Sequence, residues 1–345
     1  MKKLAVVLFN LGGPDQLDSV RPFLFNLFND PAILDLPRPA RWLLAQWISR
    51  RREAPAREIY EKIGGKSPLV EQSQLQAAAL EERLRTKFEA RVFVAMRYWH
   101  PMSDETAAAV KIFSPDEIVL LPLYPQFSTT TSGTSLQEWN RAAAAAGLRV
   151  PTHAVCCYPT APGLLRAQAK LIGAGLQEAS RAGKPRLLFS AHGLPQKIID
   201  RGDPYQEQIE RTAAAVVGEL TVPDLDWLVC YQSRVGRLRW IGPSTEEALE
   251  QAAKDRVPVV VVPISFVSEH SETLVELDIT YRRRCRELAI PAFIRVPALA
   301  TRVEFIDSLA YIVETALKWQ PGRIATGDKT ACSPVMGRCL HDRRF

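Results

Sequence analysis

Residues 186–190 read Arg-Leu-Leu-Phe-Ser and continue into Ala191-His192-Gly193-Leu194-Pro195. A short apolar run that ends in Gly and Pro predicts a buried strand. Seven further runs of this kind occur along the chain: Leu4–Leu11, Arg91–Ala95, Glu117–Leu123, Thr152–Cys157, Trp227–Gln232, Val257–Ile264 and Phe293–Val296. Continuous apolar strands are typical of parallel sheets that helices cover on both faces. We therefore expect an α/β fold with doubly wound parallel sheets.

Longer segments with helical periodicity separate these runs: Glu71–Arg85, Leu136–Ala146, Leu164–Arg181, Tyr205–Leu220, Glu246–Lys254, Glu272–Leu288 and Val303–Trp319. A length of 345 residues suggests two domains. The pattern divides near residues 150–165, which predicts two α/β halves of similar size. The segment after Trp319 contains Gly322, Gly327, Pro334 and Gly337, and we expect it to be irregular.

The composition is that of a globular protein, with 47% apolar and 24% charged residues. No window approaches the roughly 20 uncharged apolar residues that a membrane span needs. The N-terminal apolar run stops at Asn10 and lacks a small-residue cleavage site, which favours a first strand of a cytoplasmic protein over a signal peptide. The net charge of +6 is too small to predict nucleic-acid binding by itself.

Ligands of open parallel sheets bind beyond the carboxyl ends of the strands, so these ends are the candidate sites. The first strand ends in Asn10-Leu11-Gly12-Gly13-Pro14, which is not GxGxxG, and no GxxxxGK[ST] occurs, so no nucleotide is expected. His192 follows another strand directly. An imidazole at this place acts as a base, as a metal ligand or as a structural residue.

A second histidine follows the strand Val259–Pro263. His270 lies two residues before Glu272, and Glu272 and Glu276 are spaced i,i+4, on one helix face. Ser268 is a candidate N-cap for this helix, which gives Glu272 a structural role as an alternative. Imidazole and carboxylate together suit iron(II), zinc or cobalt(II). We therefore expect a metal site assembled from His192, His270, Glu272 and Glu276.

Residues 31–60 interrupt the alternation. The apolar segment Trp42–Ile48 is followed at once by Ser49-Arg50-Arg51-Arg52. One interpretation is a surface helix with a solvated basic end. The other is an exposed apolar lip with a basic collar that contacts a membrane surface or an amphipathic ligand.

Several ordered motifs make the chain resemble the ferrochelatases over about residues 3–320. They are Asn10–Pro14, Tyr60 with Ile63–Pro68, Met96–Pro101, Leu123–Ser128, Ser190–Pro195, Arg201–Tyr205, Tyr231–Gly236, Trp240–Pro243, Phe266–Leu274 and Glu276–Ile279.

The resemblance implies two Rossmann-like domains with an inter-domain cleft. The N-terminal domain covers 1–160 with an apolar lip at 31–60, the C-terminal domain covers 161–320 with the metal site, and an irregular cysteine-containing tail covers 321–345. It implies an enzyme, a lyase that inserts Fe²⁺ into protoporphyrin IX in the last step of heme synthesis. Alternatives are a chelatase of this fold acting on coproporphyrin or another tetrapyrrole, and a carrier of heme or porphyrin without turnover.

The family's metal pair falls on His192 and Glu272, and its neighbouring acidic path on Glu269, His270 and Glu276. The porphyrin-lining positions fall on Leu11, Arg52, Tyr60, Arg97, Tyr98, Tyr124, Ser128, Trp240 and Phe266. We take His192 as the proton acceptor and Glu272 with Glu276 as the route for metal or for protons, and the reverse assignment stays open. Many members carry a further acidic residue one turn beyond Glu276, where this chain has Thr280.

The six cysteines are not expected to form disulfides in a cytosolic chain. Some ferrochelatases hold a [2Fe–2S] cluster, for which four ligands suffice. This chain resembles some bacterial members, and the candidate ligands are Cys156 or Cys157, Cys332, Cys339 and His341. The alternative is a tail with unligated thiols. Residues 31–52 add a peripheral contact with the inner membrane as an option, and no oligomeric state is predicted.

Overall fold

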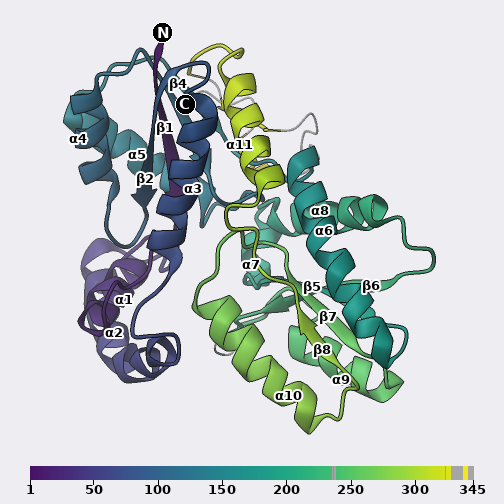
Figure 1. Cartoon of the computed structure of the whole chain (residues 1–345). Helices are drawn as coiled ribbons and strands as arrows, with labels where there is room; N and C mark the ends of the chain where they lie inside the picture. The colour runs from purple at the N-terminus through teal and green to yellow at the C-terminus, as the bar shows by residue number, and fades with distance from the viewer. Residues whose placement is uncertain (235, 237, 323, 328–336, 341–345) are drawn as a thin grey trace. The chain divides into compact units, whose positions relative to one another are not determined.

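The computed structural model describes residues 1–234, 236, 238–322, 324–327 and 337–340. The chain forms two compact units (Figure 1). Within the described residues, unit 1 comprises Met1–Cys157, Leu309–Gly327 and Leu340, and unit 2 comprises Tyr158–Ser308 and residues 337–339.

Unit 1 contains a parallel sheet of five strands in the order β2-β1-β3-β4-β9. The strands are β1 (Lys3–Asn10), β2 (Glu89–Met96), β3 (Glu117–Pro122), β4 (Thr152–Val155) and β9 (Ile324–Ala325). Residues 4–9 of β1 are buried because this strand is central and both of its faces are covered.

The helical elements of unit 1 before its last segment are η1 (Leu17–Ser19), α1 (Val20–Phe28), α2 (Arg38–Glu61), α3 (Leu69–Leu84), α4 (Ser103–Phe113) and α5 (Ser132–Ala146). Helices α4 and α5 cover one face of the sheet, where Trp139 packs edge-to-face on Phe9 with ring centroids 6.0 Å apart. Helix α3 packs on β1 and β2 (Figure 1).

Unit 2 contains a parallel sheet of four strands in the order β6-β5-β7-β8. The strands are β5 (Arg186–His192), β6 (Asp226–Gln232), β7 (Val259–Pro263) and β8 (Phe293–Arg295). The helical elements are α6 (Pro162–Ala179), η2 (Ser180–Ala182), α7 (Gln196–Asp200), α8 (Tyr205–Leu220), α9 (Thr245–Asp255), η3 (Glu272–Tyr281), α10 (Arg282–Glu287) and α11 (Val303–Ala316), which runs across the boundary at Leu309.

Helices lie on both faces of this second sheet. Gly175 of α6 approaches Val260 and Ile294, whereas α9, η3 and α10 contact the opposite side chains Val259 and Val261. Strand order is the same in the two units, since the first strand of each lies between its second and its third. This order reverses at the first strand, and the carboxyl ends of β5 and β7 therefore flank the crevice where such sheets bind ligands.

The α/β architecture and all eight predicted strands are confirmed, and α8 has the predicted bounds. The sequence patterns missed α1, α4 and α7. The segment expected to be irregular contains β9, which pairs with β4. The helix predicted from Glu272 is present, but its first ten residues form a π-helix, and its N-cap is Ser271 rather than Ser268.

The buried histidine of β4 makes stability depend on pH. His153 is 1% exposed, and neither ring nitrogen has a hydrogen-bond partner among the described residues. Burial lowers the pKa of His153, and Glu117 at 3.5 Å offsets this only in part. Below pH 6.5 the unfolded chain thus binds a proton that the folded chain binds less readily.

We expect the free energy of unfolding to fall as the pH drops from 6.5, by at most about 1.4 kcal/mol per pH unit from this residue. In His153→Leu this dependence should be weaker. Urea unfolding of both proteins at pH 5, 6, 7 and 8 measures it. Parallel pH profiles for the two proteins would contradict the assignment.

Candidate metal and proton-transfer site

The candidate site of unit 2 is centred on a pair formed by His192 and Glu272. His192 is the last residue of β5, and Glu272 is the first residue of η3, which follows β7. The Nδ1 atom of His192 lies 2.8 Å from Oε2 of Glu272, and the two side chains are 38% and 24% exposed. The predicted pair is thus brought together, although the residues are 80 positions apart.

The two members of the pair stabilise each other's charge. Burial favours neutral His192, but the charges of Glu272 and Glu276 and the hydrogen bond to Glu272 outweigh it, so the pKa of His192 is raised. Burial likewise opposes the charge on Glu272, yet the charge of His192 and the hydrogen bonds from His192 and Ser233 lower its pKa to about 2. Glu272 is therefore ionised at neutral pH and holds the imidazole in a fixed orientation.

Strand β6 supplies the groups that hold the second carboxylate, Glu276. Gln232 pairs with His192 in the sheet, and Ser233 follows in a left-handed conformation with φ of 61°. The backbone nitrogen of Ser233 donates to Oε1 of Glu276 at 2.8 Å, and Nε2 of Gln232 donates to Oε2 at 3.2 Å. Oγ of Ser233 lies 2.5 Å from Oε2 of Glu276 and 3.1 Å from Oε2 of Glu272.

Glu276 carries its negative charge less readily than Glu272. Burial and the nearby charge of Glu272 raise the pKa of Glu276, and the hydrogen bonds from Ser233 offset this in part. Two carboxylates of one site therefore have pKa values moved in opposite directions. Such separation is typical of sites that transfer protons.

The π-helix presents this acidic pair toward β6. An i→i+5 hydrogen-bond pattern is rare and occurs mostly at functional sites. Its first turn is fixed by Thr273, whose Oγ1 accepts from the backbone nitrogen of His270 at 3.0 Å. Both Glu272 and Glu276 contact Ser233, so the predicted shared face is confirmed.

His270 lies beside the pair but in an apolar setting. Its ring packs on Phe266 with centroids 4.5 Å apart, and its Nδ1 atom has no hydrogen-bond partner among the described residues. Burial lowers the pKa of His270, which keeps the imidazole neutral. Glu269, implied as part of the acidic path, instead accepts hydrogen bonds from Arg295 at 2.5 Å and from the backbone of Ala298.

Gly193 lets a large aromatic residue approach the end of β5. A Cβ atom there would lie 2.9 Å from the carbonyl oxygen of Gln232 and 3.4 Å from the ring of Trp240. The buried Nε1 atom of Trp240 has no acceptor in the part of the chain that the structure describes. Trp240 and Phe266 are the two predicted porphyrin residues of unit 2. Trp240 lies beside Gly193, the residue after His192, and Phe266 packs on His270.

Three predicted porphyrin residues of unit 1 form one cluster with Asp30. Arg97 and Tyr98 both contact Oδ2 of Asp30, at 2.6 and 2.8 Å, and the guanidinium of Arg97 lies over the ring of Tyr98. The backbone oxygen of Leu11 accepts from Tyr98 at 2.9 Å. Leu11 also packs against the apolar cluster that contains Tyr98 and Tyr60.

The remaining predicted residues of unit 1 lie on other elements. Arg52 is exposed on α2, with its guanidinium 5.8 Å from the ring centroid of Phe28. Tyr124 and Ser128 follow β3, and burial raises the pKa of Tyr124. Ser128 is buried and its Oγ lies 2.9 Å from Oγ1 of Thr130.

The exposed apolar surface of α2 matches the predicted lip. Trp42, Leu43 and Trp47 are 48, 63 and 57% exposed. Arg51 lies over the ring of Trp47 at 5.4 Å. Among the described residues, no helix combines the length and apolarity that crossing a bilayer requires.

The candidate cluster ligands are only partly described. Cys156 and Cys157 are buried in unit 1 with their Sγ atoms 3.4 Å apart, and Leu340, which follows Cys339, packs against the same apolar cluster. Cys332 and His341 lie outside the described residues. Within the described ranges, no group of three or more His, Cys, Asp or Glu side chains is placed to hold a metal ion.

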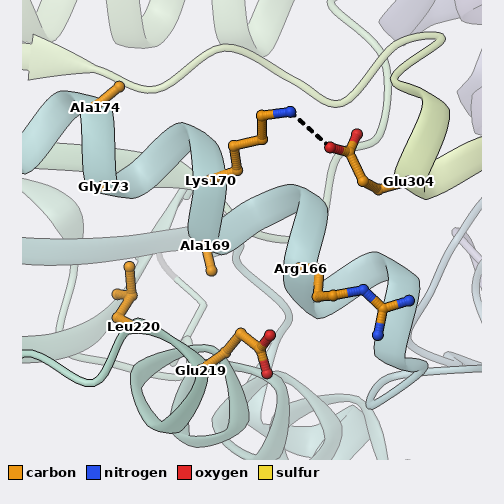
Figure 2. A pocket seen from close by; sticks show the side chains of 8 residues that line it. All are labelled: Arg166, Ala169, Lys170, Gly173, Ala174, Glu219, Leu220 and Glu304. Carbon is orange, nitrogen blue, oxygen red and sulfur yellow. Dashed lines mark hydrogen bonds and ion pairs between the residues drawn. The ribbon is translucent and has the colours of Figure 1, made fainter.

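A separate groove lies between α6, the end of α8 and the start of α11 (Figure 2). Lys170 and Glu304 form an ion pair of 2.7 Å across it, and Arg166 and Glu219 complete a set of two cations and two anions. Its charges balance, and it contains none of the predicted site residues.

Sequence reasoning missed four polar residues of the site: Gln232, Ser233, Tyr281 and Glu246. The hydroxyl of Tyr281 lies 3.1 Å from Oε1 of Glu276 and 2.9 Å from Oε1 of Glu246 on α9. The position of Gln232 and Ser233 at a strand end was a usable signal. Nothing in the local pattern pointed to Tyr281 or Glu246.

Comparison with known proteins agrees with this geometry. A family model described as Ferrochelatase matches residues 3–317. The ferrochelatase of Caulobacter vibrioides is 50% identical over 341 residues, which cover 98% of this chain and 97% of that one. The ferrochelatase of a Wolbachia of Drosophila simulans is 51% identical over 312 residues, which cover 90% of this chain and 98% of that one.

Solved structures share the fold at low sequence identity. SirB from Bacillus subtilis with Fe³⁺ aligns with a TM-score of 0.50 and 11% identity over 92% of this chain and 96% of its own. DR2241 from Deinococcus radiodurans, which has structural similarity to chelatases, aligns with a TM-score of 0.51 and 12% identity. The alignment covers 89% of this chain and 54% of that one. The family match over nearly the whole chain and the half-identical relatives together show that this chain belongs to the ferrochelatase family.

Proposed function

We propose that the protein inserts Fe²⁺ into protoporphyrin IX, with His192 accepting pyrrole protons and Glu272 presenting the metal beside it. Membership of the ferrochelatase family makes it a lyase of heme synthesis with iron as a substrate. The observation that carries the assignment of residues is the 2.8 Å contact between His192, at the carboxyl end of β5, and Glu272, at the start of the helix that follows β7.

The reaction needs these two kinds of group together. Metallation removes two protons from the pyrrole nitrogens and delivers one dication to the same centre. A histidine whose orientation is fixed by an ionised carboxylate can accept a proton while the carboxylate attracts the cation. Glu276 then takes part in proton release, because burial and the charge of Glu272 raise its pKa and so favour binding of a proton there over Glu272.

Trp240 and Phe266 offer rigid aromatic faces to a porphyrin, and Arg52 offers a cation to a propionate. In unit 1, the contacts of Arg97 and Tyr98 with Asp30 fix the side chains that the family resemblance assigns to the porphyrin pocket. A chelatase acting on coproporphyrin is the second candidate, and product analysis with each porphyrin and Fe²⁺ distinguishes the two.

Replacement of the histidine tests the assignment. We expect His192→Ala to lower Fe²⁺ or Zn²⁺ insertion by at least about 100-fold, the usual size of a lost proton-transfer group, while porphyrin still binds. Loss of porphyrin fluorescence on metal insertion measures turnover, and fluorescence titration measures binding. Lys197→Ala, an exposed change on α7, is the control. Retained turnover in His192→Ala would refute the proposal.

We further propose that α2 contacts an anionic membrane surface. Trp42, Leu43 and Trp47 supply exposed apolar area, and Arg50 and Arg51 lie one turn further along the helix. Arg51 over Trp47 places a cation beside an indole that would lie among the headgroups.

The paired change Trp42→Ser with Trp47→Ser should weaken binding to phosphatidylcholine–phosphatidylglycerol vesicles at least about tenfold, since two large apolar side chains no longer become buried. Vesicle sedimentation measures the affinity. Leu75→Ser, which changes a 57% exposed residue of α3, is the matched control. Equal sedimentation of the three proteins would exclude the contact.

We also propose a [2Fe–2S] cluster held by Cys156 or Cys157, Cys339 and two of the other candidate ligands. The buried, adjacent thiols of Cys156 and Cys157 suit thiolate ligation, and Leu340, the residue after Cys339, packs against the apolar cluster that contains both thiols. When bound, such a cluster supplies one-electron redox chemistry, and the insertion steps above do not depend on it.

Anaerobically purified, heme-free protein should show visible charge-transfer absorption and about two acid-labile sulfides per chain. Cys339→Ser should lose both signals, whereas Cys285→Ser, a change in the core of unit 2, should keep them. Absence of labile sulfide in the unaltered protein would rule out the cluster.

A further inference from the structure

The carboxylate Glu276 is linked to a second, exposed carboxylate through a buried tyrosine. Tyr281 is 2% exposed, and its ring packs in the core cluster with Leu249 of α9 and Val261 of β7. Its hydroxyl lies 3.1 Å from Oε1 of Glu276 and 2.9 Å from Oε1 of Glu246. Glu246 is exposed on α9. A single hydroxyl therefore joins the candidate site to the solvent face of another helix.

Glu276, Tyr281 and Glu246, called the triad here, share two hydrogen bonds, but the hydroxyl of Tyr281 supplies only one of the two protons that these bonds need. A tyrosine hydroxyl has one proton, so it donates to only one of the two carboxylates. The other oxygen–oxygen contact at hydrogen-bond distance needs a proton on a carboxyl group. When that proton is on Glu276, Tyr281 donates to Glu246, and when it is on Glu246, Tyr281 donates to Glu276. The two arrangements differ only in which end of the triad holds the proton.

The inner end of the triad is connected to the proton acceptor. Oγ of Ser233 contacts both Glu272 and Glu276, and Glu272 contacts His192. A proton that reaches Glu276 through Oε2 can leave it through Oε1, because Oε2 contacts the hydroxyl of Ser233 and Oε1 contacts the hydroxyl of Tyr281 beside the backbone nitrogen of Ser233. Thr280, one turn beyond Glu276, is exposed and provides no carboxylate. The carboxylate that Tyr281 connects to Glu276 is therefore Glu246 on α9 and not a residue of η3.

We propose that Tyr281 and Glu246 form the outer segment of a proton relay that carries the pyrrole protons from Glu276 to solvent. This inference rests on the proposed metal insertion. In each step the acid proton on Oε1 of Glu276 passes to the oxygen of Tyr281 while the hydroxyl proton of Tyr281 passes to Oε1 of Glu246. Glu276 becomes ionised, Glu246 becomes neutral and releases its proton to water, and the hydroxyl turns back. No electron is transferred.

The surroundings of the triad fit this role better than a purely structural one. A tyrosine held only for packing would need one acceptor, whereas this hydroxyl has two carboxylates and joins a half-buried group to an exposed one. Glu250, one turn beyond Glu246 on α9, accepts a hydrogen bond from the guanidinium of Arg284 at 3.1 Å instead of from a tyrosine hydroxyl. Glu250 therefore provides a matched comparison on the same helix.

Three variants test the relay in the steady-state insertion assay: Tyr281→Phe, Glu246→Gln and the two combined. We expect each single change to lower kcat about 100-fold, the lower end of the range for a lost proton-transfer group, with the KM for porphyrin unchanged. The combined variant should be no slower than Tyr281→Phe, because both residues act in one path. Glu250→Gln should keep the kcat of the unaltered protein.

Two further readouts separate the relay from a structural effect. The solvent deuterium isotope effect on kcat should rise in Tyr281→Phe, since proton release becomes limiting. Added acetate should restore Glu246→Gln but not Tyr281→Phe, because a soluble carboxylate can replace only the exposed end. Glu246→Gln alters a surface residue, so the test remains valid even if Tyr281→Phe folds poorly.

Each outcome has a definite meaning. If the unaltered protein inserts no metal, the proposed function fails and the relay with it. If it inserts metal and both single variants match it in kcat, the relay alone is wrong. Losses that multiply in the combined variant would also overturn the relay, because independent structural effects combine in that way.

Discussion

The contact between His192 and Glu272 is the interaction on which the rest of the site depends. His192 ends β5, and Glu272 begins the helix that follows the neighbouring strand β7, so the sheet order and the start of η3 together bring residues 80 positions apart to 2.8 Å. The raised pKa of His192 and the pKa of Glu272 near 2 have the same origin, which is the attraction of opposite charges in a partly buried place. Without Glu272, neither the orientation nor the basicity of the imidazole would be fixed.

A second carboxylate so near the first would be unfavourable without compensation. Glu276 is accommodated because β6 ends in Gln232 and Ser233, whose donors point at its oxygens. The left-handed backbone of Ser233 and the π-helical backbone of η3 are both uncommon geometries, and both serve this one contact region. Local backbone strain placed at a functional site is a recurring arrangement in proteins.

The fold could be predicted well from the sequence because buried parallel strands are apolar throughout and short. His192 could be predicted from its place at a strand end and Glu272 from the helix after the neighbouring strand, whereas their selection as a pair from the four candidates came from the family resemblance. The π-helix could not, because the i,i+4 spacing of Glu272 and Glu276 fits an α-helix equally well. Tyr281 and Glu246 were missed for another reason: they meet from segments 35 residues apart, and no local pattern reports such a contact.

The protonation state of His192 tests the central interaction most directly. Nitrogen-15 NMR of the labelled imidazole, followed through a pH titration of the metal-free protein, gives the pKa of this residue. The ion pair with Glu272 predicts a pKa above the ordinary value of about 6.5, falling clearly in Glu272→Gln. A pKa at or below the ordinary value, unchanged by Glu272→Gln, would contradict the account.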